Sequence, residues 1–284
     1  MEGILLVHKP VGPSSFDVVR MIRKLSGNKR VGHAGTLDPL ASGLLVVCLG
    51  RYTKLAGYLT NQEKSYLAKI QLGIRTTTDD QEGEVIKEAS LDGLCEEAVR
   101  EALKRFIGPL QQVPPQYSAI KIRGKRSYAL ARAHQNVDLK PREVILHDLV
   151  VRDIDLPMVE VLLLCSKGFY VRSLARDVGE VLGVGAHAAQ IHRVKSGQLS
   201  IEQATLLTEI TKENIESLLL HDHDAVQGLE IVPISDRLSQ DIIFGRTNVQ
   251  LPELNKEVAI ASCQGKLVAI LGKSTRQTEL LRVI

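Results

Sequence analysis

The sequence contains no tryptophan and few other aromatic side chains, with six tyrosines and four phenylalanines among 284 residues. Its four cysteines, Cys48, Cys95, Cys165 and Cys263, are far apart and form no CxxC pair. Disulfide frameworks and structural zinc sites use clustered cysteines, so this spacing argues against both. It favours four reduced core residues and therefore a reducing compartment.

Several well-known catalytic and cofactor-binding motifs are also missing. The chain has no GxGxxG after a predicted strand, no GxxxxGK[ST], no HExxH and no GxSxG. A dinucleotide cofactor, a P-loop nucleotide, a catalytic zinc ion and a serine nucleophile elbow are therefore poorly supported. The motifs therefore predict no cofactor.

Long hydrophobic runs are absent as well. Only four strongly apolar residues, Ile4–Val7, precede His8 and Lys9, too few for the core of a signal peptide. No run approaches the roughly 18 residues of a membrane span. We therefore expect a cytoplasmic protein.

The chain is long enough for one large domain plus a small one. Because 44% of its residues are hydrophobic, it can form a sizeable core.

The net charge of +3 says little about partners, but its distribution says more. Five lysines and arginines and no acid lie between Arg20 and Arg30. Seven lie between Lys121 and Arg142, against Asp138 alone. Such stretches suit phosphate binding, because each neutralised phosphate releases counterions, although two solvated faces explain the charge equally well. The seven basic residues of the second stretch are Lys121, Arg123, Lys125, Arg126, Arg132, Lys140 and Arg142.

Strands and helices alternate without a regular βαβ period, which predicts an α+β fold around a largely antiparallel sheet. Ser14 and Asp17 form a capping-box variant at the start of a helix that Gly27 ends. Strands are predicted at 3–9 and 42–50, a strand pair at 64–88, a helix at 95–107, strands at 141–166, helices at 170–183 and 211–227, and short strands in a β-rich domain 231–284 that follows the domain 1–230.

The stretch "GHAGTLDPLASGLL", residues 32–45, holds one formal charge, Asp38. An unpaired buried carboxylate costs several kcal/mol or changes its pKa until it is neutral, so Asp38 needs a partner or has a catalytic role. The following proline restricts Asp38 to extended conformations, and Gly32, Gly35 and Gly43 allow close backbone approach. An Asx-type turn or a helix cap explains Asp38 equally well.

This stretch resembles the signature loop of the bacterial TruB-type tRNA pseudouridine synthases, and the resemblance continues through five ordered motifs over about 190 residues. The other segments that carry it are "GILLVHKPVGPSSFDVV" (3–19), "KSYLAKIQLG" (64–73), "VPPQYSAIKIRGKRSYALAR" (113–132), and "SKGFYVRSLARDVGEVLG" with "GAHAAQIHRV" (166–194). The resemblance implies an enzyme that isomerises uridine to pseudouridine at position 55 in the T-loop of tRNA. It also implies a pseudouridine-synthase catalytic domain and, more weakly, a small C-terminal PUA-like RNA-binding domain. A monomer is the default expectation.

The resemblance assigns three catalytic residues. Asp38 matches the essential aspartate, which either attacks the nucleotide or acts as a base on the ribose. Arg172 matches the active-site arginine, whose two-pronged hydrogen bond would keep a nearly dry carboxylate ionised. Without the resemblance, Arg172 would be read as sharing a solvated helix face with Arg176. Tyr66 matches the tyrosine that stacks on the target base and helps to remove its C5 proton.

The resemblance also assigns substrate contacts. Tyr170 and Ile191 match positions that line the uracil pocket. His33 matches the residue that fills the space left by the flipped nucleotide, which offsets part of the cost of flipping. Lys9, Lys64 and the second basic stretch fit contacts to the backbone of a folded RNA loop.

The sequence departs from the family pattern at two places. Thr77 stands where the family often has aspartate, so the role of that aspartate falls to Asp79 or Asp80 or is absent. Ala34 stands where threonine is common, and we expect little effect. Two other functions remain open, namely a tRNA-binding or folding chaperone without chemistry and a carboxylate-dependent hydrolase. The hydrolase is weaker because no second acidic residue lies in a comparable loop.

Overall fold

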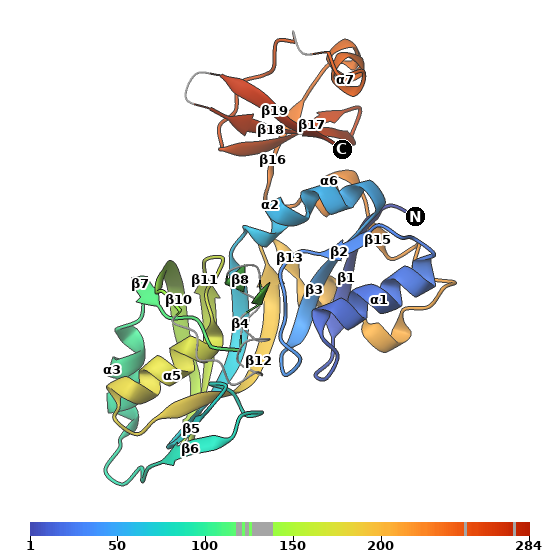
Figure 1. Ribbon diagram of the computed structural model, residues 1–284. Helices are drawn as coiled ribbons and strands as arrows, with labels where there is room; N and C mark the ends of the chain where they lie inside the picture. Colours follow the sequence, from blue (N-terminus) through green and yellow to red (C-terminus); the bar gives the residue numbers. More distant parts are fainter. Residues whose placement is uncertain (118–120, 123–124, 127–138, 247–248, 275–276) are drawn as a thin grey trace. The chain divides into compact units, whose positions relative to one another are not determined.

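The computed structural model describes residues 1–117, 121–122, 125–126, 139–246, 249–274 and 277–284 (Figure 1). The chain divides into two compact units. The first unit contains Met1–Leu37, Leu44–Thr60 and Ser196–Ile284, and the second contains Asp38–Gly43 and Asn61–Lys195. Within the ranges just given, no helix is both long and apolar enough to cross a membrane.

The first unit is built on β1 (Gly3–Lys9), the almost fully buried strand predicted from its apolar run. Its neighbours are β14 (Thr205–Leu206), which runs parallel, the antiparallel β15 (Leu219–Leu220), and β3 (Ser42–Leu49), which also pairs with β2 (Val31–His33). Apolar side chains of β1 and β3 form the core of this unit. The prediction of two buried strands here is confirmed.

Helix α1 (Ser15–Ser26) confirms the capping signal in the sequence. The Ser14 hydroxyl accepts a hydrogen bond from the Asp17 amide, the Asp17 carboxylate accepts one from the Ser14 amide, and Gly27 ends the helix with a φ of 64°. Val18, Val19 and Ile22 are buried at helical spacing. The opposite side of the helix is exposed and carries mostly charged residues, together with Phe16 and Met21.

The second unit has a sheet in the order β12 (Ala186–Ser196), β4 (Lys64–Leu72), β11 (Met158–Cys165), β10 (Arg142–Asp155) and β7 (Gly108–Gln112). The pairs β4–β11, β11–β10 and β10–β7 are antiparallel, whereas Ser42–Gly43 pairs in parallel with β12. Buried and half-exposed residues alternate along β11 and along the second half of β4. Helices α3 (Glu96–Lys104) and α5 (Val171–Val181) lie side by side on the buried face (Figure 1). The predicted α+β fold with a mixed, largely antiparallel sheet is confirmed.

The strand pair predicted at 64–88 is divided differently. Gly73, with a φ of 84°, separates β4 from β5 (Ile74–Thr76), and β5 forms a hairpin with β6 (Val85–Glu88). Further small elements occur among the described residues. They are η1 (Gly50–Leu55), α2 (Ala56–Thr60), β8 (Lys121–Ile122), β9 (Lys125–Arg126), β13 (Leu199–Ser200), η2 (Ile201–Gln203) and η3 (Leu207–Glu209).

The helix predicted at 211–227 is wrong. This segment contains turns, the short strand β15 and the single helical turn α6 (Asp222–Ala225). The side chains of Thr211 and Asn214 bond the backbone amides of one another, and such local bonds compete with a helix. Leu219 and Leu220 pair instead with β1.

The C-terminal segment forms a four-stranded sheet of β16 (Glu230–Pro233), β17 (Val258–Cys263), β18 (Lys266–Lys273) and β19 (Thr278–Val283). A small β-rich C-terminal part is thereby confirmed, while the domain boundary at residue 230 stays a prediction. Strands alone were expected here, but α7 (Asp236–Ile243) follows β16. Its signal is Ser235, whose side chain caps the helix by accepting from the Leu238 amide.

All four cysteines are free thiols. Cys48, Cys165 and Cys263 are buried, as predicted, but Cys95 is exposed at the N-cap of α3. The prediction of a core position is therefore wrong for Cys95. Its place just before an amphipathic helix resembles a core position in sequence, but the cap lies outside the buried stripe.

Candidate active site

The loop that carries Asp38 is held by β12 at residues Ser42 and Gly43. The Asp38 carbonyl accepts from the Ala41 amide at 3.1 Å, which closes a turn. Ser42 Oγ lies 2.8 Å from His192 Nδ1. Gly43 has a φ of 103°, and a Cβ at this position would lie 2.4 Å from the Arg193 carbonyl oxygen. A glycine is therefore required at position 43, and the loop is fixed against β12.

Asp38 has a charged partner and remains accessible. Its Oδ2 accepts from Arg172 Nη2 at 2.7 Å. The Arg172 side chain, near the start of α5, is 3% exposed, whereas that of Asp38 is 34% exposed. A buried guanidinium thus holds a carboxylate that a substrate can reach. The Asx-turn and helix-cap explanations do not account for this contact.

The guanidinium of Arg172 does not form the predicted two-pronged bond with Asp38. Nη1 donates instead to Asp80 Oδ2 and to the Thr78 carbonyl, each at 3.1 Å, while Nη2 also donates to the Tyr117 carbonyl at 2.8 Å. Arg172 therefore bridges two carboxylates. The prediction is wrong because Asp80, which is distant in sequence, occupies the second prong.

Asp80 is the acidic residue that the threonine-rich segment brings to this site. It is buried, and its Oδ1 accepts from the Thr78 hydroxyl and from the Glu82 amide. The Thr76 hydroxyl donates to the Asp80 carbonyl at 2.6 Å. The turn thus fixes Asp80 so that its other oxygen meets Arg172.

Asp79 binds a second arginine one helical turn along α5. Its Oδ2 accepts from Arg176 Nη1 at 3.0 Å, and Arg176 also pairs with Asp177 and donates to the Val113 carbonyl. Burial raises the pKa of Asp79, and the positive charge of Arg176 opposes this rise. Arg172 and Arg176 thus lie on a buried face of α5, and the solvated helix face is excluded.

Tyr66 lies on β4, opposite Leu163 of β11. Burial raises the pKa of Tyr66, Arg193 lowers it by its charge and by a side-chain hydrogen bond, and the nearby Asp38 raises it. Sequence reasoning missed Arg193, which is one of the largest fully buried side chains. The available signal was its place in β12, two residues after Ile191 and hence on the same face.

Tyr170 and Ile191 are the two residues predicted to line the uracil pocket. Tyr170 is the N-cap of α5, and its backbone exchanges two hydrogen bonds with the Gln112 side chain. Ile191 is buried on β12. Both belong to the second unit with Asp38, Arg172 and Tyr66. Their contact with a base stays a prediction.

The two lysines expected to bind RNA are buried. Lys9, in the first unit, donates to the carbonyls of Pro10 and Pro13, each at 2.8 Å. Lys64 donates to the Gln62 carbonyl at 2.7 Å, and its burial, with the like charge of Arg193, lowers its pKa to about 8. These ammonium groups bind backbone carbonyls rather than projecting from an exposed surface. His33, also of the first unit, ends β2 and is half-buried.

Most of the second basic stretch lies outside the described residues. Arg123 and Arg132 are not described, and nor are the side chains of Lys121, Lys125 and Arg126. Lys140 and Arg142 are exposed. Its role in binding phosphates stays a prediction.

Among the described residues, no three His, Cys, Asp or Glu side chains gather closely enough to hold a metal ion.

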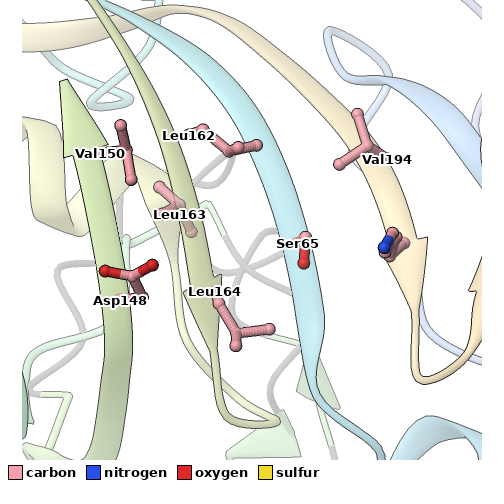
Figure 2. A pocket seen from close by; sticks show the side chains of 8 residues that line it. Ser65, Asp148, Val150, Leu162, Leu163, Leu164 and Val194 are labelled. Carbon is pink, nitrogen blue, oxygen red and sulfur yellow. The ribbon is translucent and has the colours of Figure 1, made fainter. Parts of the chain in front are cut away.

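A hollow lies on the face of the sheet opposite to that of Tyr66. It is lined by Ser65, Val150, Leu162, Leu164 and Val194 (Figure 2). Ser65 precedes Tyr66, so its side chain points to the other face of β4. This hollow is separate from the candidate active site.

Comparisons with known proteins place the chain in a class. Its fold resembles that of a chain in a crystallised Cbf5–Nop10–Gar1 complex, with a TM-score of 0.76 and 23% identity over 99% of this chain and 83% of the other. Residues 23–171 match the N-terminal domain of the TruB family of pseudouridylate synthases.

Curated relatives agree with the family match. A tRNA pseudouridine synthase B of Clostridium tetani is 42% identical over 84% of this chain and 83% of its own length. That of Thermobifida fusca is 47% identical over 75% of each chain. That of Burkholderia mallei is 48% identical over 73% of this chain and 68% of its own length. The chain is thus a pseudouridine synthase, an isomerase. It belongs to the TruB family.

Proposed function

We propose that this enzyme isomerises uridine to pseudouridine at position 55 in the T-loop of tRNA, and that Asp38 starts the reaction on a flipped-out nucleotide. The contact of 2.7 Å between the accessible Asp38 and the buried Arg172 carries the proposal. Relatives named tRNA pseudouridine synthase B support tRNA as the substrate. The five motifs support the T-loop position.

The reaction breaks the bond between N1 and C1′ and forms a bond between C5 and C1′. C5 loses its proton, and N1 gains a proton. Asp38 begins it as an ionised group, either by attacking the nucleotide or by accepting a proton from the ribose. Arg172 stabilises the ionised form and fixes its direction. Asp80 in turn fixes the second prong of Arg172.

Tyr66 stacks on the uracil ring and assists removal of the C5 proton. Stacking of a base on an aromatic ring stabilises binding by on the order of 1 to 3 kcal/mol. Arg193 orients the Tyr66 hydroxyl by its hydrogen bond. Tyr170 and Ile191 provide walls of the base pocket that exclude water, and His33 fills the space that the base leaves.

The buried positions of Lys9 and Lys64 change the proposed role of both residues. Each holds backbone carbonyls in place, while phosphate contacts fall to exposed basic residues. The hydrolase is disfavoured because the second carboxylate near Asp38, that of Asp80, is buried against Arg172. A monomeric state and a cytoplasmic location stay predictions.

The decisive experiment compares Asp38→Asn with the wild-type chain on unmodified tRNA, with pseudouridine mapped at each position. Asn keeps the shape and removes the charge, so product should vanish while tRNA affinity changes by less than about tenfold. Asp148→Asn, on the opposite sheet face (Figure 2), is the matched control and should turn over normally. Wild-type turnover by Asp38→Asn would overturn the catalytic role of Asp38. Binding of tRNA by the wild type without any product would favour a chaperone.

A further inference from the structure

Helix α1 and the segment after it present an exposed positive surface on the first unit. It consists of Phe16, Arg20, Arg23, Lys24, Lys29 and Arg30, called here the α1 basic surface. All six side chains are exposed, and no aspartate or glutamate occurs from residue 18 to residue 37. The five positive charges are therefore concentrated in the eleven residues 20–30.

The charges of this surface are poorly compensated. Among the described ion pairs, only that between Arg20 and Asp17 involves it, at 3.4 Å, with the Arg20 side chain 69% exposed. Asp17 also caps the helix and so serves two functions. On α3, by contrast, Arg100 pairs with Glu96 and Lys104 with Glu101. The α1 basic surface thus attracts an anionic partner, whereas α3 is already neutralised.

An aromatic ring lies within the charged surface. Phe16 is 55% exposed, and the guanidinium carbons of Arg20 and Arg23 lie 5.5 and 5.9 Å from the centre of its ring. Arg23 is fixed further, because its Nη2 donates to the Val31 carbonyl at 2.8 Å. Exposed aromatic rings beside arginines are typical of surfaces that bind RNA, where bases stack and phosphates pair with the cations.

We propose that the α1 basic surface binds the substrate RNA, with Arg20, Lys24 and Lys29 on phosphates and Phe16 against a base or ribose. The identity of this RNA as tRNA rests on the proposed function. The surface holds no group assigned to the chemistry. It therefore contributes to KM and to the salt dependence of binding, and it leaves the rate at saturating RNA unchanged.

The first test neutralises charge. The triple variant Arg20→Gln, Lys24→Gln, Lys29→Gln is compared with a control of equal charge change on α3, Arg100→Gln, Lys104→Gln, Arg105→Gln. Binding to unmodified tRNA is titrated from about 0.05 to 0.3 M salt. Each lost phosphate contact lowers the slope of log affinity against log salt by about 0.7, so the α1 variant should lose about two units and bind about ten- to a hundredfold more weakly. The control should keep the wild-type slope.

The second test separates stacking from charge. Phe16→Ala should weaken binding severalfold to about a hundredfold at every salt concentration and leave the slope unchanged, because stacking releases no counterions. Phe16→Tyr, which keeps an aromatic face, should restore the affinity. Thermal unfolding of each variant checks that the fold is kept.

The outcomes distinguish this inference from the proposed function. An α1 variant with the wild-type slope, or with the same loss as the α3 control, overturns the inference while a wild-type chain that forms pseudouridine still upholds the function. A wild-type chain that binds tRNA through this surface but forms no pseudouridine overturns the function alone. A lower rate at saturating RNA in the α1 variant also contradicts the inference.

Discussion

Arg172 divides its guanidinium between two carboxylates that come from different loops. Asp38 takes Nη2 at 2.7 Å and Asp80 takes Nη1 at 3.1 Å, and both prongs also reach backbone carbonyls. A planar group with fixed donors can meet all of these acceptors at once. A lysine ammonium offers one point charge and cannot span both carboxylates.

Arg172→Lys should therefore be severely damaging. Removing one partner from a buried ion pair costs about 3 to 5 kcal/mol, and lysine restores part of it. We expect the single-turnover rate to fall by roughly ten- to a thousandfold while tRNA binding stays nearly intact. Rapid-quench measurement of pseudouridine formation tests this. A wild-type rate would mean that another residue keeps Asp38 ionised.

Lys64 makes a second prediction, because burial lowers its pKa to about 8 from an ordinary value of 10.5. Between these values the unfolded chain binds more protons at this group than the folded chain does, so its unfavourable contribution fades as pH rises. The cost is about 3 kcal/mol below pH 8. The free energy of unfolding of Lys64→Met, minus that of the wild type, should therefore shrink between about pH 8 and 10.5.

Denaturant unfolding at several pH values measures this difference. Subtracting the two curves removes other groups, such as Cys48, whose pKa burial raises to about 12 and whose effect on stability has the opposite sign. A difference that is constant with pH would show that Lys64 stays charged in the folded chain. Its ammonium would then be fully compensated by its neighbours.

The turn between β5 and β6 is attached to helix α5 through Arg176 and Asp79. The neighbouring Asp80 is the residue that meets Arg172, so this ion pair holds the whole turn in place. Asp79 itself has a φ of 60°, a left-handed conformation that asparagine and aspartate tolerate. Asp79→Asn therefore removes charge without adding backbone strain.

Arg176→Met alone should destabilise the chain by about 3 to 5 kcal/mol, because it leaves the Asp79 carboxylate buried without its cation. Arg176→Met with Asp79→Asn should recover part of this loss. Urea unfolding of both single variants and the double variant gives the coupling energy. Arg75→Gln is the matched control, since its exposed pair with Glu180 also joins β5 to α5 and is worth less than about 1 kcal/mol. Equal losses at Arg75 and Arg176 would contradict the prediction.

Local signals predicted α1, because its capping box and its glycine stop lie within a few residues of each other. The helix predicted at 211–227 was wrong because tertiary pairing of Leu219 and Leu220 with β1 replaced it. The candidate active site shows the same contrast between local signals and contacts that are distant in sequence. Motifs identified Asp38 and Arg172, but the division of Arg172 depends on the meeting of residues 38, 80 and 172, which no local pattern encodes.

The N-terminal strands of the first unit share an apolar cluster with the C-terminal sheet, which also has a second cluster of its own. Ile4, Leu55 and Leu59 share a cluster with Ile260 and Ile270. The chain passes between the two units at residues 37, 43, 60 and 195, so the loop with Asp38 has both of its ends in the first unit. The stability of the first unit therefore affects the catalytic loop directly.

Tyr52 connects the N-terminal part of this core to the C-terminal part. Its hydroxyl accepts from the Asp222 amide at 2.9 Å, and Asp222 Oδ1 accepts from the Leu267 amide. Tyr52→Phe removes the acceptor of a half-buried amide and should cost about 0.5 to 1.5 kcal/mol. Calorimetry should show the N-terminal strands and the C-terminal sheet unfolding together, at a lower temperature in the variant. Tyr58→Phe, at the edge of the same cluster, should change little.

The same measurement tests the boundary predicted near residue 230. If residues 230–284 form an independent domain, that domain should unfold in a transition of its own in the wild-type chain. Tyr52→Phe should then leave the temperature of this transition unchanged. If the shared cluster of Leu55, Leu59, Ile260 and Ile270 dominates, no such transition exists, because unfolding the sheet would expose the apolar face of the N-terminal strands. The cluster shared by these two parts favours the second outcome, with one cooperative transition for the first unit.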